Sequence, residues 1–73
     1  MRSLNELVLN EKGFIEELEC EGNTRRRLLD LGLVEDAIIT PVLVSPSKDP
    51  RAFEIKGSLI ASRREEAEKI KIK

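Results

Sequence analysis

The sequence lacks histidine, tryptophan and tyrosine, and its 73 residues include one cysteine and two phenylalanines. General acid–base catalysis relies most often on histidine, and transition-metal sites usually need histidine or several cysteines. The single cysteine, Cys20, cannot form an internal disulfide, which is typical of proteins in a reducing compartment. We therefore expect no catalytic residues, no metal site and no cofactor, and we do not expect an enzyme.

Long apolar runs are also absent, and no stretch approaches the roughly 18 apolar residues that a membrane-spanning helix needs. The first residues include acidic side chains and do not resemble a signal peptide. A net charge of −1, from 13 basic and 14 acidic side chains, gives no general affinity for nucleic acid or anionic lipid. We expect one cytoplasmic domain over residues 1–73, because this length leaves no room for a second.

The most informative stretch is residues 23–33, NTRRRLLDLGL, which predicts a short α-helix over about residues 23–31. Asn23 or Thr24 is the expected N-cap. Gly32 stands where a helix commonly ends in a left-handed residue. Leu28 and Leu31 lie three positions apart, so we expect both to face the core and to plug one end of the sheet.

Five strands are expected, over residues 14–20, 37–45, 53–56, 59–62 and 70–72. The odd spacing of Ile15 and Leu18 predicts a β-bulge near Glu16 and Glu17, with a flat half-buried strand as the alternative. Pro41 cannot donate a ladder hydrogen bond, so an edge, a bulge or a barrel corner is expected there. Both phenylalanines are expected in the core.

Ser62 and Glu65 have the spacing of a capping box, which predicts a helical turn near residues 63–68. Lysines alternate with Ile70 and Ile72, and we expect them to protect an edge strand. Short strands, tight turns and one helix predict a mainly β fold, a small SH3-like five-stranded barrel. The alternative is an OB-type barrel, which has longer strands and a helix between the third and fourth.

From about Leu4 to Ile72 the sequence resembles the FeoA domain family. The resemblance rests on fragments in a fixed order: Gly13-Phe14-Ile15, Arg27 to Leu33, Asp49-Pro50, Phe53-Glu54-Ile55, Gly57, Ile60 to Arg63, Glu66-Ala67 and Ile70-Lys71-Ile72. Two places depart from the family pattern, because Glu35-Asp36 replaces a usual Pro-Gly and Ser62 replaces a usual leucine.

The resemblance implies an SH3-like barrel and an accessory role in bacterial ferrous iron uptake. The implied partner is the FeoB-type permease with its cytoplasmic G-domain, so that contact with the membrane is only indirect. We expect no nucleic-acid partner, because the net charge is slightly negative and aromatic residues for base stacking are missing. Candidate partner-binding residues are Arg25, Arg27, Leu33, Asp49 and Arg63. Weak self-association is a further hypothesis, through strand edges near Pro41 and the C-terminal lysines.

Two clusters of charge invite other interpretations. Arginines at positions 25–27, 63 and 64 could contact phosphate in a regulatory or nucleic-acid-associated SH3-like module, as in the C-terminal domain of iron-dependent repressors. Glutamates at 16, 17, 19 and 21 could bind ferrous iron, but a solvated acidic face explains them more simply. Arg27 could also stabilise the fold by pairing with a carboxylate such as Asp30.

Overall fold

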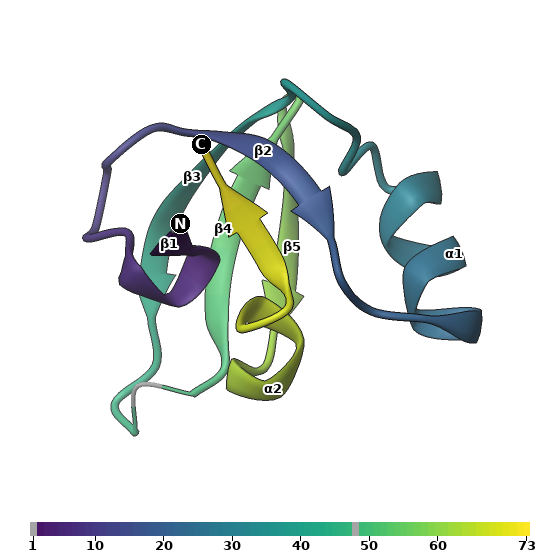
Figure 1. Ribbon diagram of the computed structural model, residues 1–73. Helices are drawn as coiled ribbons and strands as arrows, with labels where there is room; N and C mark the ends of the chain where they lie inside the picture. The colour runs from purple at the N-terminus through teal and green to yellow at the C-terminus, as the bar shows by residue number, and fades with distance from the viewer. Residues whose placement is uncertain (1, 48) are drawn as a thin grey trace.

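The computed structural model describes residues 2–47 and 49–73 as a bent antiparallel sheet with a helix standing at its side (Figure 1). The elements, in chain order, are β1 (Arg2–Ser3), the 3₁₀ turn η1 (Leu4–Glu6), β2 (Gly13–Leu18), α1 (Gly22–Asp30), β3 (Ile38–Val44), β4 (Arg51–Ile55), β5 (Ser58–Ser62), α2 (Arg64–Ala67) and β6 (Ile70–Ile72). Met1 and Lys48 belong to the domain predicted over residues 1–73 and lie outside the described residues.

The strands follow the order β1-β6-β2-β3-β4-β5, and every neighbouring pair is antiparallel. The sequence predicted five strands, but Arg2 and Ser3 add a sixth by pairing with Ile72 and Lys71. Two residues are too few to carry an alternating pattern, so this strand had no sequence signal. In the described part of the chain, β1 and β5 are the edges and do not pair, so the barrel is not fully closed.

Two bulges bend the sheet where the sequence predicted irregularity. The register between β2 and β6 shifts between Ile15 and Glu17, and Ile15 and Leu18 both face the core as a result. The register between β3 and β4 shifts between Pro41 and Leu43. The carbonyl of Pro41 accepts a hydrogen bond from the amide of Asn10 at 2.7 Å, so this place is a covered bulge rather than a free edge.

Among residues 2–47 and 49–73, fourteen buried side chains form one core, with Phe53, Ile39, Ile55 and Ile70 fully inaccessible. The expectation that both phenylalanines lie in the core was wrong for Phe14, which is 47% exposed. Phe14 lies opposite Ile38 in the β2–β3 ladder, and Ile38 is exposed as well. Ordinary alternation along β2, ahead of the bulge, turns Ile15 inward and leaves its neighbour Phe14 on the outer face of the strand.

Two predicted features of strands and caps were wrong. Strand β6 lies between β1 and β2, so the lysines beside Ile70 and Ile72 do not protect an edge. Helix α2 begins after Arg63 rather than at a Ser62 capping box, and Ser62 is buried. The carboxylate of Asp49 instead accepts a hydrogen bond from the first helical amide, that of Arg64, at 2.9 Å.

Neither helix in the described residues is long and apolar enough to span a membrane.

Candidate interaction surface on helix α1

Helix α1 has no side-chain cap at its start and a regular hydrogen-bonded motif at its end. It begins at Gly22, which has a φ of 63°, and the preceding Glu21 makes no side-chain capping bond, so the predicted caps Asn23 and Thr24 were wrong. At the other end Gly32 has a φ of 98°. The amide of Leu33 donates to the carbonyl of Leu28 at 3.0 Å, and the amide of Gly32 donates to that of Leu29 at 3.0 Å. This pair of bonds is a complete Schellman motif, as predicted for Gly32.

Few contacts attach α1 to the rest of the protein. Within the helix only Leu28 is buried, whereas Leu31 is 39% exposed, so the predicted two-leucine plug was wrong for Leu31. Arg25 donates to the carbonyl of Leu18 at 2.8 Å, and Arg27 forms an ion pair with Glu66. The helix therefore stands beside the sheet, held by one apolar side chain and two arginines (Figure 1).

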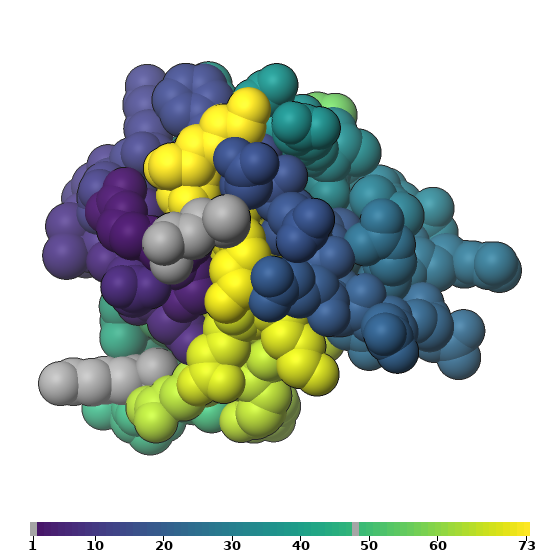
Figure 2. Space-filling view, in the orientation of Figure 1, coloured from purple at the N-terminus to yellow at the C-terminus, as the bar shows by residue number. Residues whose placement is uncertain are grey.

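A hollow of about 250 Å³ lies between β2 and α1. Leu29 and Val34 line it and are 38% and 42% exposed, and Arg25 crosses into it. A second hollow of about 290 Å³ adjoins along the helix and shares Arg25 and Leu29. In Figure 2 the residues of α1 project from the right side of the molecule, with β2 beside them. Together these residues form a partly apolar groove along the exposed side of α1.

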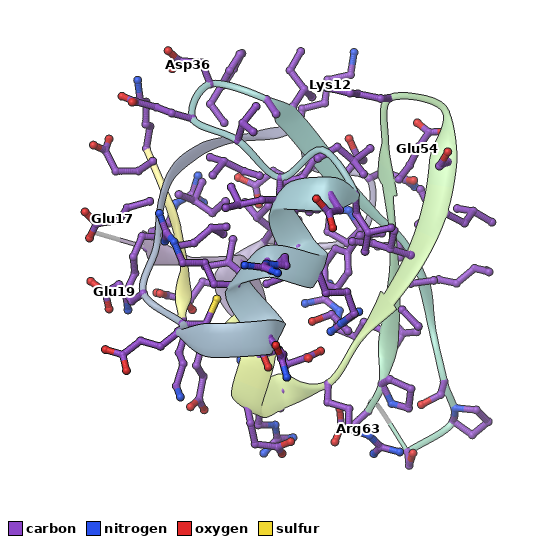
Figure 3. The ribbon with its side chains drawn as sticks, turned by 90° about the vertical axis from the view of Figure 1, so that its right-hand side faces the viewer. Lys12, Glu17, Glu19, Asp36, Glu54 and Arg63 are labelled. Atoms are coloured by element: carbon purple, nitrogen blue, oxygen red, sulfur yellow. The ribbon has the colours of Figure 1, made fainter. Side chains whose placement is uncertain are left out.

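The predicted partner-binding residues fall in three places. Arg25 and Leu33 both line the groove, although Leu33 is fully buried and only its neighbour Val34 reaches the surface. Arg27 faces α2 through its ion pair with Glu66, rather than pairing with Asp30. Asp49 and Arg63 lie at the start of α2, where Asp49 accepts the hydrogen bond from the amide of Arg64. Arg63 is exposed and lies at the lower end of the view in Figure 3.

Sequence reasoning missed Leu29 and Val34. Leu29 directly follows the buried Leu28, and neighbouring residues of a helix point about 100° apart, so only one of the two can face the core. Leu29 stands four positions after Arg25, and this i, i+4 spacing places both on the outward side of the helix. That spacing was the available sequence signal for this groove.

A larger hollow, of about 570 Å³, lies elsewhere, between η1, the β3–β4 end of the sheet and α2. Its walls combine Arg51 and Arg64 with Glu68, so the charges are mixed. The guanidinium of Arg51 donates to the carbonyls of Asn5 at 3.3 Å and Leu7 at 2.9 Å, and it lies over the ring of Phe53. Arg51 thus holds the N-terminal segment onto the sheet.

Ionisable groups with shifted pKa values lie in exposed ion pairs. A hydrogen bond from Arg2 lowers the pKa of Glu11 below its usual 4.5, and the amide of Val8 acts in the same direction. A hydrogen bond to Asp36 raises the pKa of Lys73 above its usual 10.5. Across residues 2–47 and 49–73, no three His, Cys, Asp or Glu side chains converge in a way that could hold a metal ion.

Two of the five arginines proposed for phosphate contact take part in interactions within the chain. Arg25 donates a hydrogen bond to the carbonyl of Leu18, and Arg27 forms an exposed ion pair with Glu66. Arg63 and Arg64 belong to the start of α2. The arrangement as a whole defines a small SH3-like β module with an adjacent helix and an exposed, partly apolar groove.

Comparison with known proteins identifies the module. The FeoA domain family matches residues 2–73, and the chain belongs to that family. The sequence is 35% identical over 69 residues to an Fe(2+) transport protein A/Fe(2+) transporter FeoB fusion protein of Porphyromonas gingivalis, covering 94% of this chain and 8% of that protein. The chain therefore spans less than a tenth of the length of this relative.

Solved structures give the same assignment. The FeoA protein from Chlorobium tepidum superposes with a TM-score of 0.92 at 35% identity, over 97% of this chain and 68% of that one. The FeoA protein of Stenotrophomonas maltophilia, described as a prokaryotic SH3 domain protein complexed with zinc, superposes with a TM-score of 0.87 at 25% identity, over 100% and 91% of the two chains. The predicted family and mainly β, SH3-like fold are confirmed.

Proposed function

We propose that this protein is a non-catalytic accessory factor of ferrous iron uptake that docks on the cytoplasmic part of a FeoB-type permease. One observation carries the proposal: in the Porphyromonas gingivalis relative, a similar sequence is fused to the Fe(2+) transporter FeoB. Fusion places the two parts at a high effective concentration. Where the two parts are separate chains, a docking surface would be needed to achieve the same proximity.

The groove along α1 supports docking as the mode of action. Leu29, Leu31 and Val34 are between 38% and 42% exposed on or next to the helix. When a partner covers partly exposed aliphatic side chains, apolar surface is removed from water, and this lowers the free energy of the complex. The description of the Stenotrophomonas maltophilia protein as a candidate ferrous iron transport activating factor supports a regulatory consequence of such contact.

Co-purification with the permease from the same source tests the proposal. Tagged protein should retain the detergent-solubilised permease in at least one of two states, nucleotide-free or GTP-loaded. The hydrolysis of GTP by the permease, measured with and without this protein, separates regulation of the G-domain from assembly alone. No retention in either state would contradict the proposal.

A further inference from the structure

One wall of the groove carries two glutamates that form no ion pair among the described residues. Glu16 and Glu17 of β2 line the hollow opposite Leu29 and Val34. Among the described residues neither glutamate forms an ion pair, whereas the nearby Glu19 lies 3.6 Å from the amino group of Lys71. In Figure 3, Glu17 and Glu19 project outward from the β2 side of the molecule.

The bulge in β2 explains why two glutamates in succession occupy this wall. A regular strand would turn alternate residues toward the core. The register shift between Ile15 and Glu17 lets Ile15 and Leu18 both face inward, and the two residues between them remain outside the core. The acidic wall is thus built into the same feature that bends the sheet.

The positively charged side chains near the groove, Arg25 and Lys73, already take part in other interactions. Arg25 lines the hollow, but its guanidinium donates to the carbonyl of Leu18. Lys73 forms ion pairs with Asp36 and, at 3.8 Å, with Glu35, the third carboxylate of the hollow. The hydrogen bond to Asp36 raises the pKa of Lys73, and the nearby charge of Glu16 also raises the pKa of Lys73. The groove therefore has an aliphatic side and a carboxylate side, on which Glu16 and Glu17 form no ion pair among the described residues.

We propose that this groove receives a segment of the permease that carries an aliphatic side chain flanked by lysine or arginine. The inference rests on the proposed function and specifies the chemistry of the docking contact. A cavity of about 150 Å³ holds a benzene-sized group, so a hollow of about 250 Å³ has room for one aliphatic side chain. Complementary charge at the rim would speed association and set the orientation of the bound segment.

Paired substitutions and the purified permease test this chemistry. Glu17→Lys reverses a charge in the groove, and Glu54→Lys reverses a charge on β4, which Figure 3 shows on the other side of the molecule. Leu29→Ser removes an aliphatic side chain from the groove, and Leu59→Ser is its control, on β5 and 64% exposed. Circular dichroism verifies that all four variants are folded.

We expect Glu17→Lys and Leu29→Ser each to raise the Kd for the permease about tenfold at low salt, and both controls to stay within about twofold. The effect of Glu17→Lys should shrink as salt rises, because screening weakens exposed charge pairs, whereas that of Leu29→Ser should persist. If the unaltered protein binds and both groove variants bind equally well, the groove is not the docking site, although the proposed function stands. If the unaltered protein does not bind, the proposed function and this inference fail together.

Discussion

Arg27 of α1 pairs with Glu66 of α2, joining two helices whose residues are 39 positions apart in the sequence. Their side chains are 48% and 26% exposed. The pair links the one helix that stands beside the sheet to the helical turn that precedes the last strand. It gives Arg27, a residue of the family signature, a role within this chain.

Removing this ion pair should cost little stability. We expect Arg27→Ala to lower the free energy of unfolding by less than about 1 kcal/mol, because exposed pairs are weak. Urea denaturation of Arg27→Ala, Glu66→Gln and the double variant would measure the coupling. Arg26→Ala is the matched control, because Arg26 forms no ion pair among the described residues. Strictly additive losses would show that the two side chains do not interact.

The burial of Leu28 should matter far more than that of its helical neighbours. Leu28 is 1% exposed and is the one buried residue of α1. Leu28→Ala should cost about 2–5 kcal/mol, the range for buried leucines, whereas Leu31→Ala should cost less than about 1 kcal/mol. Thermal unfolding followed by circular dichroism would compare them. Equal losses for the two variants would contradict the attachment of α1 through Leu28.

Gly32 should tolerate no side chain without loss of stability. Its φ of 98° is one that L-residues rarely adopt, and an added Cβ would lie 3.2 Å from Cδ of Lys56. Gly22 also has a positive φ, of 63°, but nothing lies within 4 Å of an added Cβ. We expect Gly22→Ala to cost about 1 kcal/mol from backbone strain alone, and Gly32→Ala to cost more. Chemical denaturation of both variants tests the order, and a larger loss at Gly22 would reverse the argument.

Glu11 should contribute an acid-sensitive part of the stability. Arg2 and the amide of Val8 lower its pKa in the folded state below the usual 4.5. A lowered folded pKa means that the stabilisation is present above the unfolded pKa and is lost as pH falls through the folded value. Glu11→Gln should therefore be less stable than the unaltered protein at neutral pH, and the difference should vanish at acidic pH. Unfolding curves measured from neutral pH to below pH 4.5 would show this convergence; a gap that persists at low pH would contradict it.

Features that depend on neighbouring residues were predictable from the sequence. The bulge after Ile15 follows from the odd spacing of inward residues, the disturbance at Pro41 follows from its missing amide, and the helix end follows from Gly32. Features that depend on residues far apart in the sequence were not predictable. Nothing local indicates that Asp49 caps α2 or that Arg27 reaches Glu66.

The groove was only partly predictable for the same reason. Arg25 and Leu33 were chosen from the sequence and do line it. Leu29 follows the buried Leu28 directly, and the placement of α1 beside the sheet leaves Leu29 at the surface. The two glutamates opposite it were interpreted as a solvated face, because their position across from an aliphatic wall depends on how α1 meets β2.

Amide chemical shifts of ¹⁵N-labelled protein, recorded while the cytoplasmic domain of the permease is added, test the central claim most directly. Docking along α1 predicts shift changes at Glu17, Leu29 and Val34, and unchanged signals at Glu54 and Leu59 on the other side of the sheet. Changes confined to Glu54, Leu59 and their neighbours, or no changes at saturating concentrations of the domain, would contradict it.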